Sequence, residues 1–336
     1  MSFLIQQTLL YSVPLLIVAL AGVFSERGGV VNLALEGTMI FGAFIGILFI
    51  NISQLNGIFT RESSQLLLIL AMAVSALFGA VFSLLLSFAA INLKANQTIS
   101  GTALNLLSPA LVLFLISVVS GGGALSMTEG DSASRFMLKR SDFGFSEAEV
   151  LNFFERTFLV KSYLTTYISL AVFIVLSVIL YRTRFGLRLR SCGENPHAAD
   201  ALGISVKRMR YAGTTISGAL SGMGGFVLIL TTANATATGD VAGFGFLALA
   251  VMIFGNWNPI SIMGAAFLFG LFKCIAASYA TIDINGDGIY SLAKFGISPN
   301  FYRMLPYLIT LTVLAFTSKH SRAPKAEGIP YDKSKR

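Results

Sequence analysis

Charged residues are scarce in this sequence. Asp, Glu, Lys and Arg make up only 12% of the 336 residues, whereas hydrophobic residues make up 55%. A soluble globular chain carries roughly a quarter of its residues as charged ones. The low charge content therefore excludes an ordinary soluble domain and indicates a protein that crosses a membrane several times.

Residues that commonly carry out catalysis are also scarce. The chain has two histidines, His197 and His320, and two cysteines, Cys192 and Cys274, without metal-ligating neighbours. It contains neither an HExxH nor a GxSxG motif, and it lacks the phosphate-binding GxxxxGK[ST] loop. We therefore expect no catalytic residue, no metal site, no disulfide and no cofactor in this chain. Any ATP hydrolysis must come from another polypeptide.

The chain is nevertheless basic, with a net charge of +8. Its Lys and Arg residues lie in loops between apolar stretches, which is typical of membrane orientation and not of a nucleic-acid surface. The loop 182–210 and the tail 318–336 together hold thirteen of the 24 basic residues. By the positive-inside bias we place both segments in the cytoplasm. We expect no nucleic-acid partner.

Apolar stretches long enough to cross a bilayer, about 20 residues each, recur along the chain. We place them at 3–24, 28–50, 65–91, 97–120, 163–181, 209–230, 259–280 and 304–317, with a shorter ninth segment at 243–255. The first has an uncharged start and no cleavage site, so it is read as a retained span. We predict an all-α polytopic membrane protein with about nine segments, eight to ten being compatible, an outside N-terminus and a cytoplasmic C-terminus.

This reading divides the chain into a transmembrane domain, 1–317, and a basic cytoplasmic tail, 318–336. Within the domain, 121–162 becomes an extracellular loop and 182–210 a cytoplasmic one. The cytoplasmic loop contains GENPHAADALG, in which Asn195 is a preferred N-cap, Pro196 suits the first helical position and Gly203 suits the stop. A helix of two turns is unstable alone, so it must dock on something, and Ala198, Ala199 and Leu202 form an apolar side. An ordinary capped turn remains the alternative.

Three stretches resemble one family. GENPHAADALGI, SERGGVVNLALEG at 25–37 and SPNFYRMLPYLITLTVLAF at 298–316 are similar to segments of nucleoside-type permease subunits of ATP-binding-cassette importers, in the sugar, nucleoside and branched-chain amino acid permease family. The similarity covers nearly the whole chain, except the loop 121–162 and the tail beyond Lys319. It implies a type II importer bundle in a bacterial plasma membrane.

The resemblance also implies partners. These are a separate ATPase that binds ATP and magnesium, a second and related permease subunit, an extracellular substrate-binding lipoprotein, and a nucleoside as solute. The short helix would then couple the permease to the ATPase. The residues expected there are Gly193, Glu194, Asn195, Pro196, Ala198, Ala199, Asp200, Leu202 and Gly203. A monosaccharide importer, an ion-coupled transporter and a membrane scaffold remain alternatives.

Polar side chains inside spans are candidates for the solute pathway, because they are costly in lipid unless they face a cavity or a partner. Asn32 and Glu36 lie one helical turn apart, and Asn105 lies in another span. Phe244 could stack on a flat base. For each, a structural role is the alternative: amides bonded to neighbouring helices, Glu36 paired with Arg27 or capping backbone, and Phe244 in packing.

Two further sequence motifs are best explained by structural roles. Gly218 and Gly222 in SGALSGMGG have the spacing that lets helices approach closely, so we expect packing there. DINGDGIY at 283–290 opens like a calcium-binding loop, but Lys294 stands where the bidentate Glu belongs. We read it as a turn between spans.

Overall fold

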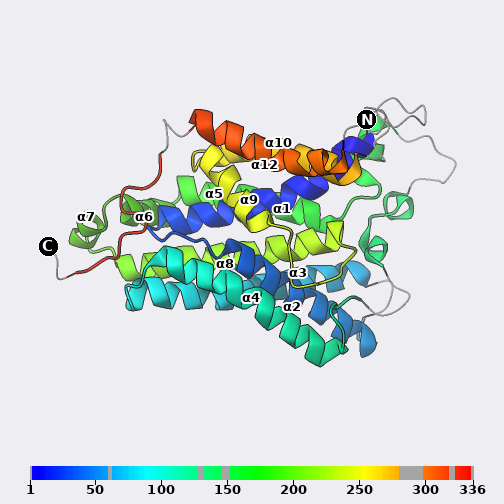
Figure 1. Ribbon diagram of the computed structural model, residues 1–336, viewed down its shortest axis with the longest axis horizontal. Coiled ribbons are helices and arrows are strands. Elements are labelled where there is room, and N and C mark those ends of the chain that lie inside the picture. Colours follow the sequence, from blue (N-terminus) through cyan, green and yellow to red (C-terminus); the bar gives the residue numbers. More distant parts are fainter. Residues whose placement is uncertain are drawn as a thin grey trace.

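The computed structural model describes residues 2–59, 63–127, 132–144, 152–279, 298–317 and 322–333. Regular structure in these residues is helical, apart from two isolated antiparallel bridges, Leu125 with Ala237 and Met137 with Tyr163. The α-helices are α1 (Ser2–Arg27), α2 (Leu35–Leu55), α3 (Ser64–Ser87), α4 (Gln97–Ser120), α5 (Leu164–Arg182), α6 (Arg184–Glu194), α7 (Pro196–Ala201), α8 (Val206–Thr232), α9 (Phe244–Phe254), α10 (Pro259–Ser278) and α12 (Pro299–Thr317). Figure 1 shows the long helices running side by side along one axis.

Seven of the described helices are long and apolar enough to cross a membrane: α1, α2, α3 with its terminal π-turn, α4, α5, α8 and α10. They coincide with seven of the eight long stretches expected from the sequence, and α9 is short, as predicted. The eighth stretch lies in α12, which is not among the seven. The all-helical prediction is confirmed, and the count of nine crossings stays a prediction. The DINGDGIY turn lies outside the described residues.

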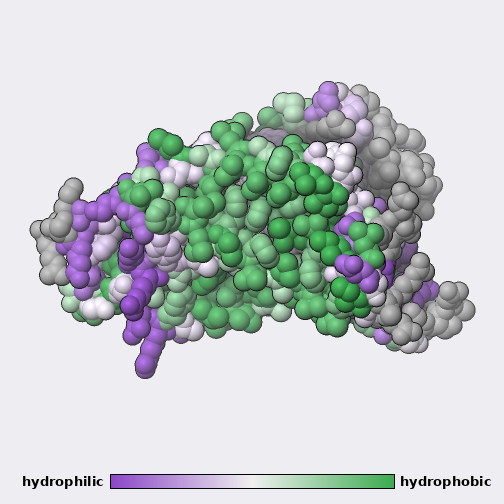
Figure 2. Space-filling model, turned by 90° about the horizontal axis from the view of Figure 1, so that it is seen from below, coloured by the Kyte–Doolittle hydropathy of each residue, from purple (hydrophilic) through white to green (hydrophobic). Residues whose placement is uncertain are grey.

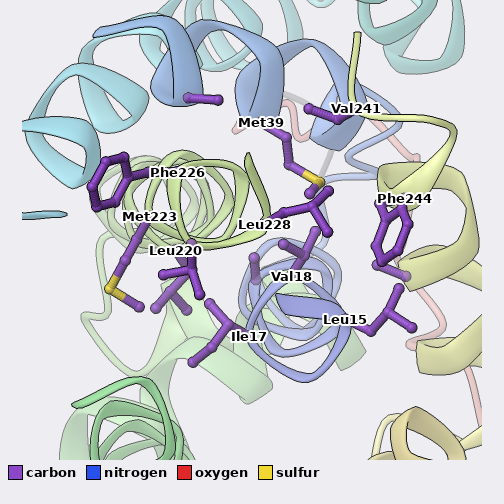
Figure 3. Close-up of a cluster of buried hydrophobic side chains, with 14 of the residues drawn as sticks. Leu15, Ile17, Val18, Met39, Leu220, Met223, Phe226, Leu228, Val241 and Phe244 are labelled. Carbon is purple, nitrogen blue, oxygen red and sulfur yellow. The ribbon is translucent and has the colours of Figure 1, made fainter. Parts of the chain in front are cut away.

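Helix α8 forms the centre of the bundle. It packs against α1, α2 and α3, and 83% of the most apolar window of both α1 and α8 is buried, against 22% for α4. Figure 3 shows Ile17 and Val18 of α1 facing Leu220 and Leu228 of α8. Helix α4 is more apolar than α8 but lies at the edge of the bundle with many exposed apolar side chains, which suit contact with lipid.

Small residues allow α8 to approach its neighbours. A Cβ atom at Gly222 would lie 2.5 Å from the Ser75 carbonyl oxygen and 2.9 Å from the Gly79 Cα, both on α3. A Cβ at Gly218 would lie 2.5 Å from the Gly79 carbonyl oxygen. The prediction that Gly218 and Gly222 serve close helix packing is confirmed.

The surface separates into an apolar band and polar ends. Figure 2 shows hydrophobic side chains across the middle and hydrophilic ones gathered at the end where Figure 1 places α6 and α7. Residues 322–333 run along that same end, and α1 begins at the other (Figure 1). We call 322–333 the C-terminal strap. The two ends of the chain therefore lie at opposite ends of the bundle.

Candidate functional site

The short helix predicted in the loop 182–210 is present as α7, at one end of the bundle. The Asn195 side-chain oxygen accepts a hydrogen bond from the Ala198 N–H at 3.1 Å, and Pro196 is the first helical residue. At the other end, Leu202 is the C-cap and Gly203 has a φ of +78°. The Gly203 N–H donates to the Asp200 carbonyl at 2.9 Å. The predicted capping is confirmed residue by residue.

The three apolar residues predicted on one side of α7 have different surroundings. Ala199 is only 2% exposed and packs against Cys192 and Val206, whereas Leu202 is 81% exposed. The Ala199 side chain therefore docks the helix on α6 and α8, and its expected role in coupling to an ATPase stays a prediction. Burial also raises the pKa of the Cys192 thiol, which keeps it protonated and unreactive.

The other residues of this region are likewise either buried or exposed. Gly193 and Pro196 are buried, and Asp200 is half-buried. We call the solvent-facing part the coupling surface. Its members from the sequence prediction are Glu194, Asn195, Ala198, Leu202 and Gly203, and His197, Lys207 and Arg208 are exposed beside them.

The C-terminal strap holds the same end together. The Ala326 N–H donates to the Gly193 carbonyl at 2.9 Å, and the buried Arg210 donates from Nη1 to the Ile329 carbonyl at 2.9 Å. Three further contacts hold it: Lys94 pairs with Asp332 at 2.8 Å, the Arg322 N–H donates to Asn256 at 2.7 Å, and the His197 and Tyr331 rings lie 5.3 Å apart. Only a basic tail could be predicted here from the sequence, since backbone contacts such as those of Ala326 and Ile329 leave no residue pattern.

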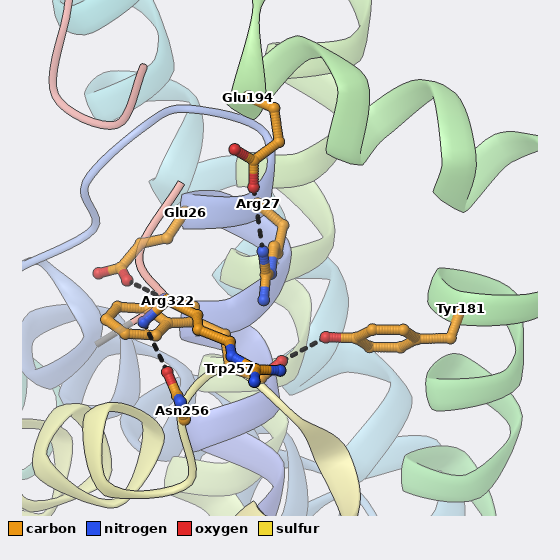
Figure 4. Close-up of polar contacts among 7 residues, drawn as sticks. All are labelled: Glu26, Arg27, Tyr181, Glu194, Asn256, Trp257 and Arg322. Carbon is orange, nitrogen blue, oxygen red and sulfur yellow. Dashed lines mark hydrogen bonds and ion pairs between the residues drawn. The ribbon is translucent and has the colours of Figure 1, made fainter. Parts of the chain in front are cut away.

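A polar cluster joins the strap to α1 and to the end of α9. The Trp257 indole N–H donates to the Glu26 carboxylate at 2.6 Å, and Arg27 pairs with Glu194 at 3.4 Å (Figure 4). Glu327 of the strap shares a hydrogen bond with Glu26. Burial raises the pKa of Glu327 to about 7, although the bond to Glu26 and the charge of Arg27 oppose the shift.

The two candidate amides of the solute pathway are used by backbone at the start of α2. Asn105 donates to the Leu33 carbonyl at 2.6 Å and accepts from the Gly37 N–H at 2.8 Å. Asn32 donates to Ser217 at 2.9 Å, and its oxygen accepts from the Ala34 N–H at 3.0 Å. Both side chains thus fix the entry into α2, which is the structural role that the sequence left open.

Glu36 also caps backbone. Its carboxylate accepts hydrogen bonds from the N–H groups of Gly243 at 2.9 Å, Gly245 at 2.5 Å and Phe246 at 3.4 Å. These are the orphan donors at the N-terminus of α9, where a negative charge is favourable. Of the two structural alternatives for Glu36, capping is confirmed and pairing with Arg27 is not, since Arg27 pairs with Glu194.

The end of α9 that Glu36 caps borders a cavity of about 810 Å³. Phe244 lines it but is 4% exposed and packed in the hydrophobic core, so its role in a solute pathway stays a prediction. Figure 3 shows its ring at the edge of the buried cluster. Besides Phe244, the lining residues with polar or aromatic side chains are Tyr11, Thr232, Thr236, Thr238, Asp240, Lys273 and Tyr307. Of the four predicted pathway residues, the structure brings only Phe244 to this cavity directly.

The sequence offered a weak signal for the other lining residues. Lys273 is the one basic residue inside the span 259–280, and an intramembrane charge is a site candidate by default. Tyr11 and Tyr307 are each one of several aromatic residues in their helices, without any pattern that would single them out. Asp240 lies in the loop before α9, and only the fold brings it beside Lys273.

The coupling surface and the cavity lie at different ends of α8. Val206, the first residue of this helix, packs under α7, and Leu228 and Thr232 near its end line the cavity. The 27 residues of α8 span about 40 Å. One continuous helix therefore connects the two regions.

Comparison with known proteins agrees with this architecture. The chain matches the family model described as branched-chain amino acid transport system / permease component over residues 4–314. It is 38% identical to the nucleoside ABC transporter permease protein NupC of Lactococcus lactis, over 100% of this chain and 98% of the relative. It is 37% identical to the guanosine ABC transporter permease protein NupQ of Bacillus subtilis, over 100% and 98%.

A more distant relative is the nucleoside ABC transporter permease protein NupB of Lactococcus lactis. It is 26% identical over 48% of this chain and 41% of the relative. No solved structure matches the chain. The match to the family model over most of the chain, and to two relatives over its full length, shows that the chain belongs to the family of branched-chain amino acid transport system permease components.

Proposed function

We propose that this chain is the membrane-spanning permease subunit of an ATP-binding-cassette importer that moves nucleosides across a bacterial plasma membrane. The observation that carries the proposal is its full-length similarity to a nucleoside permease and a guanosine permease, at 38% and 37% identity. The capped helix α7, presented at one end of an apolar bundle, supports it as the element that meets an ATPase.

The coupling surface faces the cytoplasm. The positive-inside bias supports this side, because Lys207 and Arg208 lie beside α7 and the basic strap runs along the same end. Helix α1 begins at the opposite end of the bundle (Figure 1), which we infer to face outward. Nine crossings, with α9 and α12 included among them, are compatible with ends on opposite sides.

The importer needs further subunits for ATP hydrolysis, for completing the pore and for delivering the solute. A separate ATPase binds ATP and magnesium and docks on the coupling surface through the exposed Leu202. A second, related permease completes the pore, as the similarity of this chain to both NupC and NupB of one organism suggests. An extracellular binding lipoprotein delivers the nucleoside to the outward end of the bundle.

The geometry supports a simple path for the motion. Ala199 is buried between α6 and the start of α8, so a displacement of α7 moves the end of α8 with it. A packed helix moves as a rigid element and not as a spring. The other end of α8 lines the cavity, which changes shape when the helix shifts.

Reconstitution of the complete importer tests the proposal. ATP-dependent uptake of guanosine or uridine into proteoliposomes is expected. Uptake of only a pentose or hexose would instead indicate a monosaccharide importer. Uptake that needs only a proton gradient would indicate an ion-coupled transporter, and an intact complex without uptake would indicate a scaffold.

The coupling surface has its own test. Leu202→Arg places a charge on the 81% exposed side chain of α7, and co-purification with the ATPase should be lost. Leu55→Arg is the matched control, because Leu55 is 68% exposed at the end of α2, on the side predicted to face outward. Equal retention of the ATPase by both variants would contradict the docking proposal.

A further inference from the structure

The cavity beside α9 contains a cation inside an apolar helix. The Lys273 ammonium lies 4.7 Å from the centre of the Phe244 ring and 5.4 Å from that of Tyr307. It donates to the Ala242 carbonyl at 3.3 Å, and among the described residues no carboxylate pairs with it within 4.0 Å. A charge in a membrane segment that lacks an ion-pair partner marks a solute pathway by default.

Aromatic rings form the walls around this cation. The rings of Phe244 and Tyr11 lie 6.2 Å apart at an interplanar angle of 28°, and Tyr307 is 52% exposed where it meets the cavity. Base-on-aromatic stacking is available to any flat heterocycle. The exposed part of the Tyr307 ring is therefore suited to a nucleobase, whereas a pentose or hexose has no π face and offers only C–H groups to the ring.

An acceptor lies across from the donor. Asp240 lines the cavity, and its Oδ1 accepts from the Ala242 N–H at 2.9 Å, which fixes the side chain. An ionised carboxylate only accepts hydrogen bonds and an ammonium only donates them. The Thr232 hydroxyl donates to the Leu228 carbonyl at 2.7 Å and is left as an acceptor, whereas the hydroxyl of the exposed Thr238 can do both. The cavity thus offers a donor, an acceptor and a stacking surface together.

The volume and the position agree with a small flat solute. Ligand cavities of about 300–1,000 Å³ are usual for molecules of this class, and this one measures about 810 Å³. It also lies at the end of α8 that is remote from the coupling surface, so a shift of α8 reaches it. Glu36 contributes from outside by capping α9 and holding Phe244 in place.

We propose that this cavity is a nucleoside-binding site that prefers bases with a carbonyl group. Lys273 donates to the base carbonyl and ring nitrogen, Asp240 accepts from a base N–H or a ribose hydroxyl, and Tyr307 stacks on the base. Guanine presents two acceptors, O6 and N7, whereas adenine replaces O6 with an amino donor. The site therefore favours guanosine over adenosine. The proposal rests on the proposed function and names the residues that select the solute.

Uptake kinetics in proteoliposomes containing the complete importer and its binding protein test the site. For Lys273→Met we expect the KM for guanosine to rise about tenfold, and the preference for guanosine over adenosine to fall by a similar factor, as loss of a charged hydrogen bond to the base predicts. Lys273→Arg keeps the cation and retains the preference. Tyr307→Leu raises the KM for both nucleosides by the same factor, since stacking does not distinguish them.

A control variant is available on the same helix, away from the cavity. Phe267→Leu changes a 46% exposed ring on the same helix α10 that does not line the cavity, and it should leave both KM values unchanged. Size-exclusion chromatography with the ATPase checks that each variant complex is assembled. If the Lys273→Met complex does not assemble, Tyr307→Leu still tests the cavity. A working importer whose KM values and preference are unchanged in these variants overturns the site. A wild-type importer that moves no nucleoside overturns the proposed function itself.

Discussion

At the scale of single residues, Glu327 is the most informative side chain of the strap. Burial raises its pKa from 4.5 to about 7, so the docked strap holds a proton that a detached strap releases. A group with a raised pKa favours the docked state fully below pH 4.5 and loses this contribution as the pH rises toward 7. Docking of the strap should therefore weaken between about pH 4.5 and 7.

A spin label on the strap measures this dependence. Lys325→Cys is exposed, and the native Cys192 and Cys274 are buried, so the label reacts at the new position. We expect the mobile fraction of the label to grow as the pH rises from 4.5 to 7. Glu327→Gln, which mimics the protonated carboxyl, should keep the label immobile across this range, and a profile identical to wild type would contradict the assignment.

Residue identities were predictable from the sequence more often than their contacts. Asn32, Glu36 and Asn105 stood out because polar groups in spans need partners, and each has a partner in the structure. Each has a partner distant in sequence, which is backbone for Glu36 and Asn105 and the Ser217 hydroxyl for Asn32. Only the fold decides this, so spacing could not separate a capping role from a solute contact.

At the scale of elements, helix α7 and its caps were predictable because capping is local chemistry. Its orientation was not, since Ala198, Ala199 and Leu202 are all apolar and which of them faces the bundle depends on Cys192 and Val206. The same contrast applies to α8. Its small residues indicated close packing, but the sequence did not name α3 as the neighbour.

The α8 interface with α3 provides an element-scale prediction. Gly222→Ala puts a methyl group 2.5 Å from the Ser75 carbonyl oxygen, so the helices must separate. Overpacking of this kind costs about 1–3 kcal/mol, and the apparent Tm of the purified protein in detergent should fall.

Gly264→Ala is the matched control for this substitution. An added Cβ there meets no atom within 4 Å, and Gly264 lies within α10. Its Tm should be equal to or slightly above that of wild type, because Ala favours helix more than Gly. Equal Tm values for both variants would show that α8 and α3 do not pack as closely as described.

At the scale of the whole molecule, composition alone was enough to predict a helical membrane bundle, and seven of its long apolar stretches coincide with spanning-length helices. The strap was beyond prediction, because its contacts with Gly193 and Arg210 use its own backbone groups. Sidedness rests on the distribution of Lys and Arg, which the fold gathers together with α7 at one end.

Cysteine labelling in intact cells tests the sidedness directly. Leu202 and Leu55 are 81% and 68% exposed and lie on α7 and α2, and the two native cysteines are buried. If the positive-inside bias places α7 in the cytoplasm, Leu55→Cys reacts with a membrane-impermeant maleimide added outside. Leu202→Cys then reacts only with a permeant maleimide or after the cells are opened. The reverse pattern would invert the bundle, and with it the assignment of α7 to the ATPase and of the cavity end to the outward side.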